Sequence, residues 1–307
     1  MAKLLKPENF IKYLKCPCPK GGDLKITGKS VSCSECGKSY SFEDNILNFI
    51  KSDELESSKS RELKAHTYEL SKEMIEHYAN KERWSRFYDH FSEKKIRHLL
   101  NYFDRLNCGE FFALGTGTGF ELKKILSKRK FEAIYASDIS NTALRIVPHS
   151  LSQFNIKCGL FTSDLDYCPI KTKEMPVLIY EAMHHTDDMH ATIESLLKKG
   201  YRDILFVEPT TNGLVKLLAK LGLAEREEYS GLKPKWLELG KLNELTRKYG
   251  YKSSIITMWD IPEGYFRKFY KKEGIVQDMF LSFVDMISGI TNLFKFGSFS
   301  IVHLRKR

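Results

Sequence analysis

The chain has 307 residues, and 49 Lys+Arg against 39 Asp+Glu give it a formal net charge of +10. A hydrophobic content of 42% with 29% charged residues is typical of a folded protein with a full core and excludes a disordered chain. The longest apolar region, residues 275–302, is interrupted by Asp278, Asp285 and Lys295, so we expect no transmembrane span. The N-terminus lacks the apolar segment and cleavage site of a secretion signal, which favours a cytoplasmic location.

The basic excess is spread along the chain. Residues 1–60 carry 10 Lys+Arg and 8 acids, a net charge of +2, and residues 201–307 carry 18 and 12, a net charge of +6. Proteins that bind nucleic acid usually concentrate Lys and Arg on one face or in one arm. A nucleic-acid partner is therefore not favoured, and a lysine-rich solvated surface is the simpler interpretation.

Four of the seven cysteines lie within the first 36 residues, at Cys16, Cys18, Cys33 and Cys36. Their spacing is C-x-C, then 14 residues, then C-x-x-C, and glycine turns flank short strands expected at 24–26 and 30–32. Thiolates on two such loops can close a tetrahedral Zn²⁺ site, which would be structural because four sulfurs leave no open position. Four unconnected reduced thiols are the alternative, and the C-x-C knuckle is one residue shorter than the usual C-x-x-C.

The polar, serine-rich residues 51–60 indicate a linker after the cysteine-containing segment of residues 1–50. Residues 61–106 contain no proline, and their apolar residues recur at intervals of three and four, which predicts amphipathic helices. We expect the aromatic cluster of Trp84, Phe87 and Tyr88 to pack in the core. The linker and these helices, residues 51–106, precede a main domain at 107–307.

A glycine-rich loop opens this main domain. An apolar run at 110–114 leads into Gly-Thr-Gly-Thr-Gly at residues 115–119, and a helical pattern follows at 120–126. Strand, glycine loop and helix bring backbone close to a nucleotide-like ligand, and a side chain on the loop would hold that ligand away. The spacing is G-x-G-x-G, which differs from the dinucleotide fingerprint G-x-G-x-x-G.

Further apolar runs at 131–137, 156–162, 175–180, 204–207, 251–259 and 299–304 alternate with helical segments. This alternation predicts an α/β fold: a Rossmann-like, doubly wound, mostly parallel seven-stranded sheet covered on both faces. Asp138 and Asp164 end the second and third runs, where carboxylates can accept hydrogen bonds from ribose hydroxyls and from an adenine amino group.

The glycine loop, Asp138, Asp164 and the segment Met183-His184-His185 together resemble class I S-adenosylmethionine (SAM)-dependent methyltransferases over about residues 85–260. The resemblance implies that the loop passes under the methionine part of SAM, that Asp138 holds the ribose and that Asp164 faces the adenine. The cofactor-binding residues that it implies are Gly115, Thr116, Gly117, Gly119, Asp138, Ile139, Asp164, Leu165 and Glu181.

Two features qualify the comparison with that family. The family usually has an acidic residue two positions before the first glycine, near the SAM amino group, and this chain has Ala113 there. Either Glu121 or Glu181 replaces that residue, or cofactor affinity is reduced. Residues 13–49 resemble the zinc ribbon that precedes the catalytic domain in some bacterial methyltransferases, with Asn45 in place of the ribbon's closing glycine.

Methyl transfer from a sulfonium is an in-line displacement that depends mainly on alignment of the acceptor and exclusion of water. A base is needed only if the acceptor carries a proton. His184 and His185 follow the fourth strand at the edge where ligands bind, so they are the candidate catalytic residues. Packing of both histidines against the cofactor domain is the alternative role.

Helical insertions near 210–240 and 262–296 are rich in aliphatic and aromatic residues. Such residues could roof the pocket over a small or lipid-like organic acceptor, although a homodimer interface would use the same residues. A ribosomal-RNA-type acceptor recognised by the zinc ribbon is the second hypothesis. A non-catalytic protein that keeps only the SAM-binding fold is the third.

Overall fold

The structure is a computed structural model that describes residues 2–28, 30–50, 57–68, 70–80, 85–220, 235–261, 264, 266–267 and 274–307. Most of the linker expected at 51–60, Trp84, and large parts of both insertions, at 221–234 and within 262–273, lie outside the described residues. Among the helices described, none has the length and apolar content needed to cross a bilayer.

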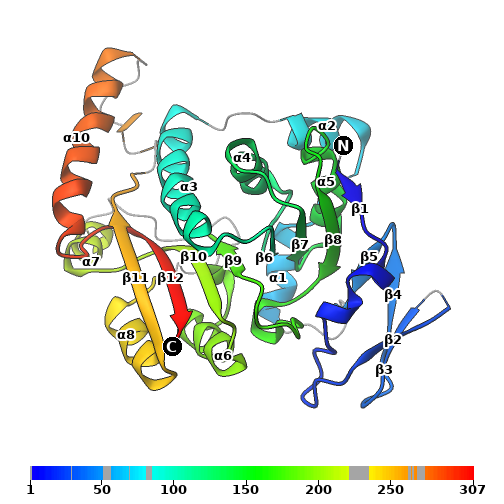
Figure 1. Ribbon diagram of the computed structural model, residues 1–307. Coiled ribbons are helices and arrows are strands. Elements are labelled where there is room, and N and C mark those ends of the chain that lie inside the picture. The colour runs from blue at the N-terminus through cyan, green and yellow to red at the C-terminus, as the bar shows by residue number, and fades with distance from the viewer. Residues whose placement is uncertain are drawn as a thin grey trace.

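Seven strands form the centre of the sheet in the order β8-β7-β6-β9-β10-β12-β11 (Figure 1). Neighbours from β8 to β10 are parallel, and only β12 runs antiparallel to the strands on both sides of it. The arrangement confirms the expected Rossmann-like, mostly parallel sheet, because β8-β7-β6-β9-β10 is the 3-2-1-4-5 order of doubly wound folds. The strands are β6 (Glu110–Leu114), β7 (Ala133–Asp138), β8 (Lys157–Thr162), β9 (Val177–Tyr180), β10 (Asp203–Pro209), β11 (Tyr251–Met258) and β12 (Phe299–Lys306).

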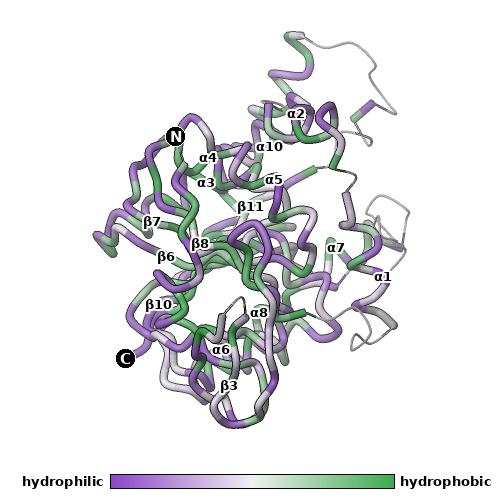
Figure 2. The backbone as a smooth tube through the Cα atoms, turned by 90° about the vertical axis from the view of Figure 1, so that its right-hand side faces the viewer, coloured by the Kyte–Doolittle hydropathy of each residue, from purple (hydrophilic) through white to green (hydrophobic). Residues whose placement is uncertain are grey.

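Helices cover both faces of the sheet, and β6 shows the two layers in its alternating side chains. Phe111 and Ala113 pack in the layer that contains α3, α4, α5 and α10, whereas Phe112 and Leu114 face α6 and α8. Figure 2 shows hydrophobic residues gathered in the central strands. The helices are α3 (Arg86–Leu106), α4 (Phe120–Lys128), α5 (Asn141–Ser150), α6 (Met189–Lys199), α7 (Gly213–Lys220), α8 (Leu239–Lys248) and α10 (Ile275–Asn292).

The cysteine-containing segment extends the sheet beyond β8. β5 pairs in parallel with β8 and antiparallel with β4, and an antiparallel β2–β3–β4 ribbon continues from there. β1 also pairs with β8, next to β5 along that strand. The sheet is therefore continuous from the cysteine ribbon to β11. The strands are β1 (Lys3–Leu4), β2 (Leu24–Thr27), β3 (Ser30–Cys33), β4 (Ser39–Glu43) and β5 (Ile46–Asn48).

Two short helices, α1 (Ser57–Ala65) and α2 (Lys72–Asn80), precede α3. α1 begins inside the segment expected to be a linker. The chain between α1 and α2 is held against α5, because the backbone N–H of Tyr68 donates to Oγ1 of Thr142 at 2.9 Å. α3 begins at Ser85, whose hydroxyl caps the helix by accepting from the N–H of Tyr88, and ends at Asn107 in the left-handed conformation.

Candidate functional site

A cavity of about 570 Å³ lies at the carboxyl edge of β6, β7, β8 and β9. We call it the central cavity. It is lined by the glycine loop, by the residues after β7, β8 and β9, and by side chains from α1, α3 and the segment between α1 and α2. The predicted site residues that line it are Gly115, Thr116, Gly117, Asp138, Ile139, Asp164, Leu165, Glu181, His184 and His185.

The glycine loop needs its glycines for two separate reasons. Gly115 has a φ of 66°, and a Cβ atom there would lie 2.4 Å from Cβ of Ala182. Gly117, with a φ of 51°, has open space where a Cβ would stand, so its glycine keeps the cavity free. Gly119 is not among the cavity residues; it caps the start of α4 with a φ of 83° and lies against Val147.

Asp138, at the end of β7, is buried below the glycine loop. Its Oδ2 accepts from the N–H of Gly117 at 2.8 Å, and its Oδ1 accepts from the N–H of Ser140 at 2.9 Å. A carboxylate has about four acceptor positions, so Asp138 retains capacity for two further donors from the cavity. Burial raises the pKa of Asp138, although both N–H bonds oppose that rise.

Asp164, at the end of β8, meets a lysine that sequence reasoning did not assign to the site. Nζ of Lys59, on α1, lies 2.8 Å from Oδ1 of Asp164 and 2.6 Å from Oδ2 of Asp166. The same Oδ1 accepts from the N–H of Asp166, which caps the short turn that contains Leu165. Lys59 is buried, so α1 closes this end of the cavity with an ion pair.

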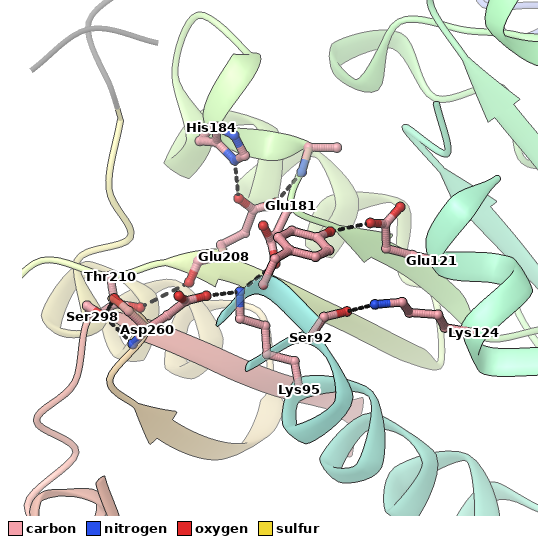
Figure 3. Close-up of polar contacts among 12 residues, drawn as sticks. Ser92, Lys95, Glu121, Lys124, Glu181, His184, Glu208, Thr210, Asp260 and Ser298 are labelled. Atoms are coloured by element: carbon pink, nitrogen blue, oxygen red, sulfur yellow. Dashed lines mark hydrogen bonds and ion pairs between the residues drawn. The ribbon is translucent and has the colours of Figure 1, made fainter. Parts of the chain in front are cut away.

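Several carboxyl groups gather at the other end of the cavity (Figure 3). The hydroxyl of Tyr88 donates to Oε1 of Glu121 at 2.5 Å. Nζ of Lys95, buried on α3, lies 2.7 Å from Oε1 of Glu181 and 2.5 Å from Oδ2 of Asp260. Burial and the nearby charge of Glu181 raise the pKa of Glu121 and of Asp260.

We call Glu121, Glu181 and Asp260 the acidic cluster. Its three carboxyl groups outnumber the single positive charge of the buried Lys95. Glu121 and Glu181 both line the central cavity. Glu181 takes a φ of 48°, which is unusual for a residue with a side chain and turns its carboxyl toward Lys95. This end of the cavity therefore suits a positively charged ligand group.

The two candidate histidines differ in their partners. Nδ1 of His184 donates to Oε2 of Glu208 at 2.8 Å, and Oε1 of Glu208 accepts from the N–H groups of Ala182 and Met183 at 2.9 and 2.7 Å. Glu208 is fully buried at the end of β10. Because the Glu208 carboxylate accepts the hydrogen bond from Nδ1–H, the neutral ring of His184 has its free lone pair on Nε2, which can accept a proton. The ring of His185 contacts that of His184, with ring centroids 4.1 Å apart and the ring planes tilted by 41°.

Sequence reasoning missed Glu208, which lies behind His184, and the cavity residues that come from segments before the glycine loop. Glu208 was visible as the carboxylate that ends an apolar strand, which was the signal that singled out Asp138. Tyr88 was expected in the core with Phe87; Phe87 is buried, but Tyr88 faces the cavity. His66 and Tyr68 carry no motif, and only the docking of α1 and α2 places them there.

The four predicted cysteine ligands form one cluster. Their sulfurs all lie within 4.8 Å of one another, with 3.7 Å between Cys16 and Cys36 and 4.0 Å between Cys18 and Cys33. A tetrahedral Zn²⁺ with bonds of about 2.3 Å places its sulfurs about 3.8 Å apart, so the cluster fits that ion. A Cβ atom at Gly22 would lie 2.7 Å from Sγ of Cys33, which explains the glycine there.

The thiols of the cluster have opposite electrostatic surroundings. Burial raises the pKa of Cys16 to about 12, whereas the backbone N–H of Gly22 lowers the pKa of Cys18 to about 6. Four thiolates at this spacing need a cation in order to be ionised together. Tyr40 contacts Sγ of Cys16 through its hydroxyl at 2.9 Å, and such outer partners orient metal ligands.

No protein-family model and no curated protein matches the chain. Solved structures similar to it include magnesium protoporphyrin IX methyltransferase from Synechocystis PCC 6803 with bound SAM, with a TM-score of 0.49 at 9% identity over 83% of this chain and 99% of that chain. The YcgJ protein from Bacillus subtilis has a TM-score of 0.46 at 12% identity, covering 70% and 98%. A methyltransferase from Thermotoga maritima described as a possible histamine N-methyltransferase has 0.45 at 14%, covering 72% and 90%. At these identities each likeness is one of fold.

Proposed function

We propose that this protein is a SAM-dependent methyltransferase that acts on a small or lipid-like organic acceptor and holds a structural Zn²⁺ in its cysteine ribbon. One observation carries the proposal. A single cavity brings together the glycine loop, a carboxylate with spare acceptor capacity after β7, a second carboxylate after β8, and an acidic cluster near the loop.

Each part of SAM has a matching group in this cavity. Asp138 would accept the two ribose hydroxyls with its remaining lone pairs. Asp164 would face the adenine, where both of its contacts among the described residues use Oδ1 and leave Oδ2 for an amino group. Glu121 and Glu181 would receive the ammonium of the methionine part, in the role that Ala113 cannot perform.

SAM, when bound, would supply an electrophilic methyl group that needs no further activation. The chain's own residues then position the acceptor and exclude water. Nε2 of His184 can take a proton from an acceptor hydroxyl or amine, and Glu208 holds the ring in the tautomer that allows it. Glu208 thus acts as a positioning residue, because it is buried behind the histidine.

The surroundings of the cavity favour a compact organic acceptor. Tyr68, Tyr88 and Phe120 add aromatic surface to the lining, and α1 closes the adenine end through Lys59. An RNA acceptor recognised through the ribbon would call for a basic ribbon surface. Residues 1–60, which comprise the ribbon and the start of the segment that follows it, carry a net charge of only +2 before any zinc–thiolate charge is counted.

Calorimetric titration with SAM tests the proposal first. We expect saturable binding to the wild type, about tenfold or more weaker in Asp138→Ala because charge-assisted hydrogen bonds to the ribose are lost. Glu244→Ala, which removes an exposed carboxylate on α8 away from the cavity, serves as the matched control and should bind like the wild type. Absence of binding at millimolar SAM would overturn the proposal.

Tritiated SAM then separates the acceptor classes. Label should enter the organic-soluble or small-molecule fraction of a cell extract and should not enter total RNA. Label in RNA alone would replace the small-acceptor proposal with the RNA hypothesis. SAM binding without label in any fraction would favour the non-catalytic alternative.

A further inference from the structure

Helix α10 carries a second apolar face in addition to the one that packs on the molecule. Leu281 and Val284 are buried against the core. On another side, side chains at successive intervals of three and four residues are between 44% and 77% exposed: Val276, Met279, Phe283, Met286, Ile290 and Leu293. We call this set the α10 stripe. It spans about 100° of the helix surface and about 27 Å of its length.

Both carboxylates of α10 point away from the stripe. Asp278 pairs with Arg86, and Asp285 pairs with Lys94 and with His90 at 3.1 Å, all three on α3. Both acidic side chains of α10 therefore form ion pairs that hold α10 against α3. The exposed positions that border the stripe are Asp278, whose carboxylate is paired with Arg86, and the uncharged Ser282 and Gly289.

Helix α7 lies near the C-terminal end of α10 and carries further exposed apolar side chains. Nδ2 of Asn212, at the start of α7, donates to the carbonyl of Gly297 at 2.8 Å, which fixes α7 beside the chain that leaves α10 (Figure 1). Leu214 and Leu217 of α7 are exposed, as is Phe294 just after α10. α7 follows the carboxyl end of β10. α10 leads into the start of β12, which lies beside that same end because β12 is antiparallel to β10. This surface therefore lies at the carboxyl edge of the sheet, where the central cavity also lies.

Basic side chains outnumber acidic ones around this surface among the described residues. Exposed Lys216, Lys220 and Lys295 flank it, whereas the acids near it are Glu238, close to Lys216, and Asp278, which pairs with Arg86. Apolar side chains bordered by Lys and Arg are the composition of helices that lie in the interface of an anionic bilayer.

We propose that the face formed by the α10 stripe and α7 docks on an anionic lipid surface. A second copy of the chain is the other occupant that this spacing could suit, because intervals of three and four also make a coiled-coil seam. Coiled-coil partners are selected by charges that flank the seam, and here the flank has Ser282, Gly289 and one charged residue, Asp278, which already pairs with Arg86 of the same chain. The lysines lie instead on α7 and at the helix end, where they would face phospholipid headgroups.

The docking surface also bears on the acceptor, and this consequence rests on the proposed methyltransferase function. The surface and the central cavity share one edge of the sheet, so docking would bring that edge to the bilayer. An acceptor dissolved in the lipid could then reach the cavity without crossing water. This consequence selects the lipid-like class among the organic acceptors.

Vesicle co-sedimentation of the full-length protein tests the docking surface. We expect binding to vesicles of phosphatidylcholine with phosphatidylglycerol, weaker binding to phosphatidylcholine alone, and loss of binding as salt rises. Phe283→Asp with Met286→Asp should lower the partition coefficient about tenfold or more, because two apolar side chains no longer enter the interface. Lys216→Gln with Lys295→Gln should lower binding only to the anionic vesicles.

Ile26→Asp is the matched control, since Ile26 is exposed on β2 at the opposite end of the sheet (Figure 1). It should bind vesicles like the wild type, and thermal unfolding should show that all variants are folded. A wild type that stays in solution with both lipid compositions would overturn the docking surface. A wild-type dimer that Phe283→Asp with Met286→Asp converts to a monomer, without vesicle binding, would assign the stripe to a second copy. SAM titration depends neither on vesicle binding nor on oligomeric state. It therefore distinguishes failure of the docking surface from failure of the proposed function.

Discussion

At the scale of single residues, the central cavity holds carboxyl groups in surroundings that oppose their charge. Burial raises the pKa of Glu121 and of Asp138, and Glu181 adds its charge against Glu121. A folded-state pKa above the unfolded value gives stability that is complete below the unfolded pKa and is lost as the pH rises through the folded one. Ionisation of Glu121 and Asp138 at neutral pH therefore lowers the free energy of unfolding of the ligand-free protein.

Glu121→Gln should separate stability from ligand binding. We expect the ligand-free variant to unfold at a higher temperature than the wild type at pH values above about 4.3, because the destabilising ionisation is removed. SAM should bind about tenfold or more weakly, since a charge-assisted contact to its ammonium is lost. Wild-type affinity should rise with pH through the raised pKa of Glu121, and the affinity of the variant should lack that dependence.

Thermal unfolding from pH 4 to 8 and titration with SAM over the same range measure both effects. Glu244→Gln, an exposed carboxyl on α8, controls for the change in net charge. A variant with unaltered affinity would assign the ammonium contact to Glu181 instead.

Glu208→Gln should affect turnover without affecting SAM binding. A Gln amide can still accept from the N–H groups of Ala182 and Met183, but its NH₂ would donate to Nδ1 of His184 and place the proton on Nε2. With the acceptor found by tritium labelling, we expect kcat to fall about tenfold to a hundredfold and the pH profile to change. His184→Asn should give a loss of at least that size, and equal kcat in Glu208→Gln and wild type would contradict the positioning role.

At the scale of elements, the ribbon and the catalytic sheet are one hydrogen-bonded structure. β5 pairs with β8 residue for residue, from Ile46 opposite Leu160 to Asn48 opposite Thr162. Oγ1 of Thr162 then accepts from the N–H groups of Phe49 and Ile50. β8 carries Asp164 just after its end, so the ribbon supports a strand that positions a cavity residue.

Leu47→Ala should therefore destabilise the whole chain. Leu47 is fully buried between the ribbon and the sheet, and removal of its side chain leaves a cavity that costs about 2–5 kcal/mol. Ile26→Ala, on the exposed side of β2, should change the free energy of unfolding by about 0.5 kcal/mol or less. Denaturant unfolding followed by fluorescence and circular dichroism should show one common transition, and a separate early transition of the ribbon would contradict the coupling.

The sequence was sufficient to place Asp138 and Asp164, because each ends a buried apolar run and parallel strands share their carboxyl edge. Glu181 and His184 follow from the same rule applied to β9. Lys59, His66 and Tyr68 could not be found in this way. They reach the cavity from helices that have no fixed place along the sheet, and their positions depend on packing between segments far apart in the chain. The β5–β8 pairing escaped sequence reasoning for the same reason.

At the scale of the whole molecule, the cysteine cluster lies at one end of a continuous sheet and α10 at the other (Figure 1). The ribbon has few apolar side chains of its own, and its strand β2 is mostly exposed. A metal bound by the four thiolates would add its binding free energy to the folding of this end. Through β5 and β8 that contribution would extend to the central cavity.

Cys36→Ser should release the metal and lower the stability of the entire protein. Purified wild type should contain one zinc per chain by atomic absorption, and Cys36→Ser should contain little. We expect its melting temperature to fall by about 10 °C or more, in keeping with a loss of several kcal/mol. Cys108→Ser, at a thiol outside the cluster, should keep both the zinc and the melting temperature. Zinc-free wild type of unchanged stability would contradict a structural metal.

The pairing of β5 with β8 also sets an order of events on the ribosome. Asn48 and Thr162, which share a side-chain hydrogen bond, are 114 residues apart in the chain. At the usual pace of translation this interval takes roughly 6–23 s, during which the edge of nascent β5 that later pairs with β8 has no partner strand. The exposed edge of β5 can pair with strands of neighbouring nascent chains on the same polysome. Slower elongation between β5 and β8 should therefore increase co-translational aggregation.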